Sequence, residues 1–140
     1  MDYPGYSWTA GSRKHRVSRS QARHVVEHAG LYFARPAAPP DRPDDALLFV
    51  GDDAHGVKLE VLGVELADGR LRVIHAMPMR PGYEPLYQEA HKWRQGRSQH
   101  EPDSRSPGRG TPLDGEYEEA LAGEADEGFD PAGLVRRRSS

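Results

Sequence analysis

Five cationic or titratable side chains lie close together near the N-terminus of this 140-residue chain. Within seven consecutive positions the sequence places Arg13, Lys14, His15, Arg16 and Arg19. Lysine and arginine bind phosphate through charge-assisted hydrogen bonds, and histidine exchanges protons near neutral pH. The segment therefore predicts a phosphate-binding site that includes Lys14 and His15. The alternative is a solvated, basic start of a helix without a ligand.

A second group of such side chains lies within and on either side of the apolar run at 71–77. It consists of Arg70, Arg72, His75 and Arg80. Strict strand alternation places Arg72 on one face and His75 on the opposite, more apolar face. That parity predicts a packed, structural His75, unless the strand ends before it and its side chain is free to turn.

Other patterns exclude several kinds of site. His24 and His28 lie four positions apart, which suits a pair of metal ligands on a helix, but no third ligand follows at a recognisable spacing. The chain has no Gly-rich phosphate loop, no G-x-S-x-G and no H-E-x-x-H motif, and it has no cysteine for a disulfide or a thiolate site. We therefore expect neither a metal nor a cofactor.

The elements that must position these groups follow from periodicity and turn chemistry. Ser18 as N-cap and Gly30 as stop predict a helix over 19–29, and a proline-rich loop occupies 34–45. Apolar runs predict strands at 46–51, 57–66 and 71–77, and a helix with proline at its start covers 84–94. The apolar parity of the second strand changes near Gly63, which predicts a bulge there. The short aromatic segment at 1–12 is compatible with an edge strand. The resulting prediction is an α+β domain: a helix, a three-stranded antiparallel meander and a second helix.

Charge and composition divide the chain at Gly96. Of the 19 basic and 22 acidic residues, 13 and 12 precede Gly96, so the front carries a formal charge of +1 and the tail −4. The pI of about 6.2 argues against nucleic-acid binding by the whole chain. The charge of the front segment taken alone does not argue against it. We expect the α+β domain over 1–95, a disordered linker over 96–113, and an acidic tail over 114–140 with a short helix and a basic end.

The sequence also lacks a membrane signal. No apolar run approaches the roughly 18 residues that a spanning helix needs, and the N-terminus lacks the apolar core of a signal peptide. We therefore expect a cytoplasmic protein that makes no contact with a membrane.

The order of the features resembles a known family. Trp8 precedes Lys14-His15-Arg16-Val17-Ser18 at the start of a helix, and the last strand of the meander contains Arg72-Val73-Ile74-His75-Ala76 before a helix with Tyr87. Over about residues 6–94 this pattern resembles the BrnT toxins of bacterial type II toxin–antitoxin systems. The resemblance implies a RelE-like fold and a metal-independent endoribonuclease that cleaves RNA and inhibits translation. It also implies a cognate antitoxin with a ribbon-helix-helix domain, through which operator DNA is bound indirectly.

The same resemblance suggests roles for five residues. Lys14 and Arg72 would hold the scissile phosphate, and His15 would act as general acid or base. His75 stands at the family's serine position and could share that role, and Arg80 could replace a family arginine whose position is taken by Met77. Because that arginine is missing, and Arg16 replaces the glycine of the family's Lys-His-Gly motif, an alternative stays open. In it, the chain is a catalytically degenerate module that binds antitoxin or RNA without cleavage.

The tail has a resemblance of its own. Residues 116–138 have Glu-Tyr, an acidic alanine-rich stretch, Gly128-Phe129-Asp130 and a basic end. This order is similar to the N-terminal stretch of many antitoxins. Two interpretations follow: a piece of a partner fused to the toxin, whose acidic residues could lie on the basic face, or an ordinary disordered tail.

Overall fold

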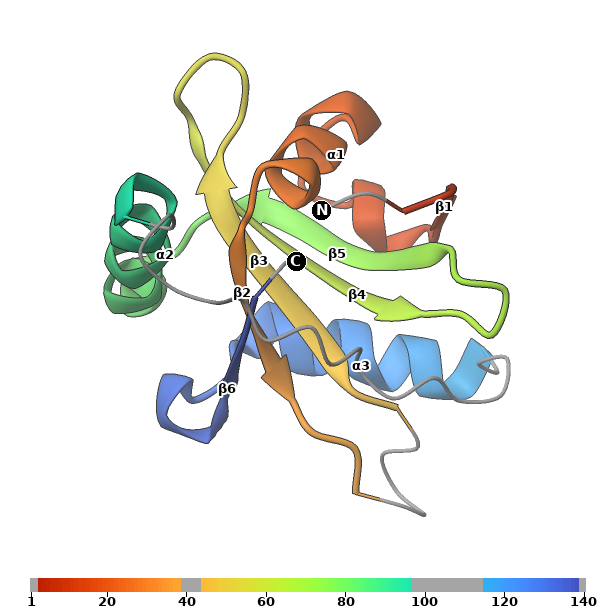
Figure 1. The fold of residues 1–140 in the computed structure, drawn as a ribbon. Coiled ribbons are helices and arrows are strands. Elements are labelled where there is room, and N and C mark those ends of the chain that lie inside the picture. The colour runs from red at the N-terminus through yellow and green to blue at the C-terminus, as the bar shows by residue number, and fades with distance from the viewer. Residues whose placement is uncertain (1–2, 39–43, 97–114, 139–140) are drawn as a thin grey trace.

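A single six-stranded sheet organises the computed structural model, which describes residues 3–38, 44–96 and 115–138 (Figure 1). The strands lie side by side in the order β1 (Tyr6–Trp8), β5 (Leu71–Pro78), β4 (Lys58–Glu65), β3 (Ala46–Asp52), β2 (Leu31–Arg35) and β6 (Val135–Arg138). β1 runs parallel to β5, and every other neighbouring pair is antiparallel.

The predicted arrangement of helix, three-stranded meander and helix is therefore wrong, and with it the RelE-like fold, although the α+β class fits. β3, β4 and β5 form the predicted antiparallel meander at the centre of the sheet. The sheet continues on both sides, however, because β1 pairs with β5 while β2 and β6 extend the edge beyond β3. A strand at Leu31–Arg35 was not predicted, since this run is short and follows directly after a helix.

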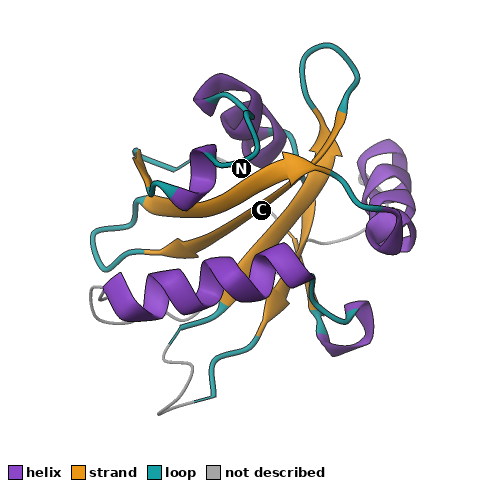
Figure 2. Ribbon diagram, turned by 180° about the vertical axis from the view of Figure 1, so that it is seen from behind, coloured by secondary structure: helices purple, strands orange, loops and turns teal. Residues whose placement is uncertain are grey.

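Helices cover both faces of the sheet. α1 (Arg19–Glu27) packs on one face, and α2 (Glu84–Gly96) and α3 (Gly115–Glu127) pack on the other, where α3 crosses the strands (Figure 2). α1 begins as predicted at Ser18, whose side chain and that of Gln21 form a reciprocal capping box. The described part of the chain also has three short 3-10 turns: η1 (Gly11–Arg13), η2 (Pro81–Tyr83) and η4 (Pro131–Gly133).

The irregularity expected near Gly63 lies between β4 and β5, and the extra residue belongs to β5. Leu62 pairs with His75 but Gly63 pairs with Val73, so Ile74 is passed over. β4 itself is buried on both faces, which explains its apolar residues at both parities without a bulge in that strand. The shift in β5 turns His75 toward α3, and the side-chain parity predicted for His75 is thereby corrected.

The C-terminal segment folds against the domain. α3 buries Leu121 and Ala125 in the core cluster that includes Ile74, and Leu134 joins the same cluster before β6 pairs with β2. The prediction of a disordered tail is therefore wrong for residues 115–138, whereas the short acidic helix predicted within that tail is present as α3. The predicted linker lies outside the described residues except for Gly96, the last residue of α2. Among the described residues, no helix is long and apolar enough to cross a membrane.

Candidate functional site

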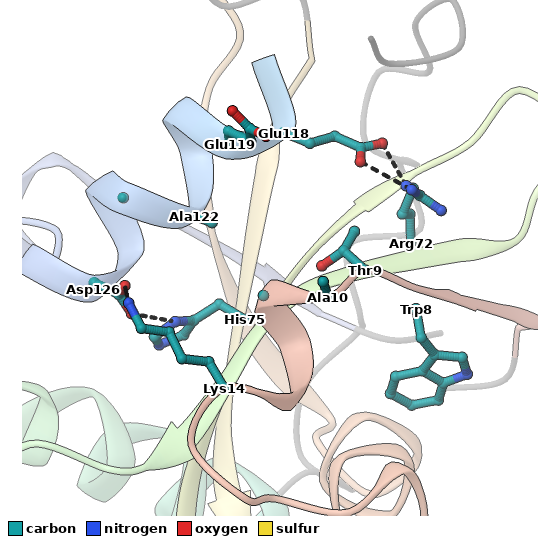
Figure 3. Close-up of a pocket in the computed structure, with 12 residues that line it drawn as sticks. Trp8, Thr9, Ala10, Lys14, Arg72, His75, Glu118, Glu119, Ala122 and Asp126 are labelled. Atoms are coloured by element: carbon teal, nitrogen blue, oxygen red, sulfur yellow. Dashed lines mark hydrogen bonds and ion pairs between the residues drawn. The ribbon is translucent and has the colours of Figure 1, made fainter. Parts of the chain in front are cut away.

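A cavity of about 510 Å³ opens between the β1–η1 segment, β5 and α3 (Figure 3). Lys14, Arg72 and His75 line it from the body of the domain, and Glu118 and Asp126 line it from α3. The cavity thus has a cationic wall and an acidic wall, and the acidic one comes entirely from the C-terminal segment.

The turn η1 carries Lys14 and His15 to this cavity. The Thr9 hydroxyl and backbone amide donate to the Val73 carbonyl, both at 3.2 Å, which fixes the turn against β5 beside the irregularity. A Cβ at Gly11 would lie 3.1 Å from the Ile74 carbonyl oxygen, so glycine permits this close approach. As a result the His15 ring lies edge-on to the His75 ring, with ring centres 5.5 Å apart.

Asp126 joins these groups. Its carboxylate accepts a bond from Lys14 Nζ at 2.6 Å and contacts His15 Nε2 at 2.9 Å and His75 Nδ1 at 3.3 Å. The Lys14 bond, followed by that of His15, lowers the pKa of the Asp126 carboxyl to about 2. Asp126 is therefore an anion held by two residues of the N-terminal segment and one of β5.

Glu60, on β4, holds His75 from the other side. Glu60 Oε2 lies 3.1 Å from His75 Nε2, and Arg80 donates to both oxygens of the same carboxylate, at 2.9 and 2.7 Å. Burial raises the pKa of Glu60, but the hydrogen bonds of His75 and Arg80 outweigh burial and lower it overall. An ionised Glu60 accepts only, so Nε2 must donate to it and Nδ1 is the nitrogen that faces the cavity.

Arg72 forms the far end of the cationic wall. Its guanidinium donates to both carboxylate oxygens of Glu118, with Nη2 to Oε2 at 2.9 Å, and it also bonds the Ser7 hydroxyl on β1. The Arg72 side chain is 27% exposed and that of Glu118 is 14% exposed. This fork geometry is the one by which arginine also takes two oxygens of a phosphate.

All five predicted site residues come together here, in two layers. Lys14, Arg72 and His75 line the cavity, His15 lies beside it on Asp126, and Arg80 lies behind His75 on Glu60. The other basic residues near the N-terminus lie elsewhere; the Arg19 guanidinium, for example, lies over the Trp8 ring. His24 and His28 stack on each other with ring centres 4.1 Å apart and bond backbone carbonyls.

Sequence reasoning missed Glu60, Glu118 and Asp126. Glu60 is only 1% exposed, and its signal was a charged residue inside the apolar run VKLEVLGVEL. Glu118 and Asp126 lie in an acidic stretch whose composition is ordinary for a solvated helix. Their role depends on where the tail docks, which periodicity does not indicate.

Three groups of the site have the geometry of metal ligands. The ligand atoms of His15, His75 and Asp126 lie within 4.8 Å of one another. The Glu60 carboxylate behind His75 is the kind of partner that orients a ligating histidine. Lys14 already neutralises the Asp126 carboxylate, however, so the cluster is balanced in charge by protein groups. Its chemistry as it stands is proton transfer and anion binding.

Comparison with family models, with curated proteins and with solved structures finds no match to this chain. The function is therefore argued from the site.

Proposed function

We propose that this chain is a BrnT-like toxin, a metal-independent endoribonuclease that cleaves RNA in the cytoplasm and so inhibits translation. The observation that carries the proposal is the convergence of two histidines with Lys14, Arg72 and Arg80 from three separate segments. Cleavage of RNA through its 2′-hydroxyl needs a base, an acid and cations that stabilise the charge on the phosphorane. The site supplies all three from protein side chains.

The roles follow from exposure and partners. His15 is the more exposed imidazole, with 26% of its side chain accessible, and is suited to take the 2′-hydroxyl proton. His75 is 2% exposed and anchored through Nε2 by Glu60, so its Nδ1 is fixed to give a proton to the leaving 5′ oxygen. Lys14 and Arg72 hold the non-bridging phosphate oxygens.

The backbone at Arg16 supports the family resemblance independently. Arg16 has φ 63°, in the left-handed region that favours glycine, and it stands where the BrnT motif has glycine. This position thus has the backbone conformation that glycine adopts readily, although its residue is arginine.

The same proposal includes a partner. A cognate antitoxin with a ribbon-helix-helix domain would neutralise the toxin and bring it to operator DNA indirectly. The site can bind an acidic helix, because Glu118 and Asp126 of α3 already occupy it. We expect the antitoxin to present a segment of this kind.

One observation favours the alternative of a non-catalytic module that binds RNA or antitoxin. Met77 replaces the family arginine, and the guanidinium nearest to it, that of Arg80 at 3.4 Å from Met77 Sδ, is tied to Glu60. An arginine bound to a buried carboxylate contributes less charge to a phosphate than a free one does.

Cleavage of labelled RNA by the purified full chain in EDTA tests the proposal. Arg72→Ala and His75→Ala should each lower the rate by about 100-fold or more, because each removes a group that acts in the transition state. Arg70→Ala and His55→Ala are matched controls, since Arg70 is paired on the surface with Asp68 and His55 is exposed in a turn. Equal rates in all four variants would overturn the assignment, and RNA binding without product would support the non-catalytic module.

A further inference from the structure

We propose that residues 115–138 are a built-in inhibitor, which occupies the cationic wall of the cavity in place of an RNA backbone. The proposal rests on the proposed function in naming RNA as the competitor. The occupant of the surface formed by η1, β5 and the β2 edge is this chain's own C-terminal segment.

The acidic side chains of α3 lie where phosphates would bind. Glu118 binds Arg72 through two parallel hydrogen bonds, and Asp126 contacts Lys14 and His75 (Figure 3). Asp126 also contacts His15. Glu118 and Asp126 are eight positions apart, so they lie on one side of the helix. Each carboxylate thus neutralises side chains that would contact RNA in the proposed mechanism.

The C-terminal end of α3 is fixed as well. Arg80 donates to the Ala125 carbonyl at 2.6 Å and to the Asp126 carbonyl at 3.0 Å, which are among the last carbonyls of the helix. Gly128 ends the helix at φ +96°, and a Cβ there would lie 2.8 Å from Arg80 Nη1. Arg80 therefore contacts both parts: it binds Glu60, which holds His75, and it binds the C-terminal end of α3.

Apolar and strand contacts anchor the rest of the segment. Leu121, Ala125 and Leu134 are at most 5% exposed, and four residues of β6 pair with β2. An isolated helix of 13 residues is marginal in water, so α3 depends on this docking for its stability.

The acidic charge of α3 distinguishes an inhibitor of the site from a helix that only covers the sheet. Six acidic residues and no basic ones lie in 115–127. A cover needs apolar contacts alone, whereas an occupant that competes with RNA needs anions on the cations of the site. Glu118 and Asp126 are those anions. Glu127 and Asp130 are exposed in the same segment and do not line the cavity, so they provide a matched comparison.

The first test compares two charge reversals in the full chain. Glu118→Lys with Asp126→Lys should speed amide hydrogen exchange in α3 and tighten binding of a labelled single-stranded RNA by about tenfold or more. Glu127→Lys with Asp130→Lys has the same net charge change in the same segment, at exposed positions outside the cavity, and should change RNA affinity much less. Faster exchange in α3 with the two doubles equal in RNA affinity would overturn the inhibitor. Tighter binding with no cleavage product would leave the inhibitor standing and overturn the ribonuclease.

The second test keeps every side chain of the body in place. A protease site inserted within 97–114 allows the tail to be cut after folding, and the cut tail should stay bound at low salt and be displaced by single-stranded RNA. A tail that stays bound at saturating RNA overturns the proposal. An uncut chain that migrates as a dimer would assign the segment to a second copy instead, which also overturns inhibition within one chain.

Discussion

Glu60 connects the chemistry of the site to the stability of the fold. It is 1% exposed and binds two residues. One oxygen contacts His75, and the two oxygens together accept hydrogen bonds from the guanidinium and the backbone amide of Arg80. A buried carboxylate is tolerated only when its charge and hydrogen bonds are matched, and these partners provide that match. Glu60 is a positioning residue, because it acts on substrate through His75.

Glu60→Gln should therefore destabilise the protein and alter the site together. The amide keeps the size of the side chain but removes the charge opposite Arg80, which we expect to lower the free energy of unfolding by about 2–4 kcal/mol. Urea unfolding at neutral pH measures the change. Glu84→Gln is the matched control, because Glu84 pairs with Lys58 at the surface, and it should unfold close to wild type. Equal loss in both variants would contradict the role given to Glu60.

Residue types predicted one half of the site. Lys14, His15, Arg72, His75 and Arg80 could be selected from the sequence because cations and imidazoles are rare enough to be noticed in clusters. Their carboxylate partners could not, since α3 is distant in sequence from both clusters. The contact of Glu60 with His75 depends on the exact register of β4 and β5, which local patterns do not give. The direction of His75 was also mispredicted, because one extra residue in β5 reverses strand parity.

At the level of elements, the cationic wall of the cavity depends on the irregularity at Ile74 in β5. It allows Arg72 and His75, three positions apart, to contact the same helix. Gly63 lies opposite, and a Cβ there would come within 3.0 Å of both the Arg72 carbonyl oxygen and Leu71 Cδ1. A carbonyl in a paired strand cannot move away easily, so this position favours glycine on steric grounds.

Two glycine substitutions should therefore change stability in opposite directions. Gly63→Ala should lower the free energy of unfolding by about 1–3 kcal/mol through overpacking. Gly123→Ala, in α3, meets nothing within 4 Å and should raise it by about 0.5–1 kcal/mol through helix propensity. Thermal unfolding of both variants beside wild type measures the pair. Stabilisation by Gly63→Ala would contradict this steric argument and mean that the space between β4 and β5 accepts a methyl group.

The elements that could be predicted are those with strong local signals. The helix at 19–29, the three central strands and the helix at 84–94 have caps, a hairpin turn and alternating or periodic apolar residues, and each lies near its predicted bounds. β2 and β6 have only short runs, LYFAR and VRRR, and become strands because each pairs with a neighbour. A triple-arginine strand in particular contradicts intrinsic propensity, and edge pairing outweighs that propensity here.

For the whole molecule, the C-terminal segment serves both the core and the site. Without α3 and β6, Leu62, Val64 and Ile74 would lose the cover given by Leu121 and Leu134. The ion pairs of Glu118 and Asp126 add a part of the docking free energy that depends on charge. The two parts respond differently to solution conditions, because apolar burial is insensitive to pH while the Asp126 carboxyl, whose pKa is lowered by its partners, loses its charge in acid.

Acid should therefore weaken docking in a defined pH range. The folded pKa of Asp126 is about 2, below the usual aspartate value of 3.8, so its stabilisation is complete above about pH 4 and is lost as pH falls through 2. A shift of this size corresponds to roughly 2 kcal/mol. Asp126 faces Lys14 and His15 of the N-terminal segment and His75 of β5, and Arg80 bonds its carbonyl.

Asp126→Asn isolates this contribution. The variant should be less stable than wild type at pH 5–7 and should lose less stability between pH 4 and pH 2, so that the two denaturation curves approach each other in acid. Glu60 also has a lowered pKa, but it is present in both proteins and cancels in the difference. Glu127→Gln, at the exposed neighbouring position, should follow the wild-type profile. A constant gap between Asp126→Asn and wild type across this range would mean that the Asp126 charge does not hold the tail.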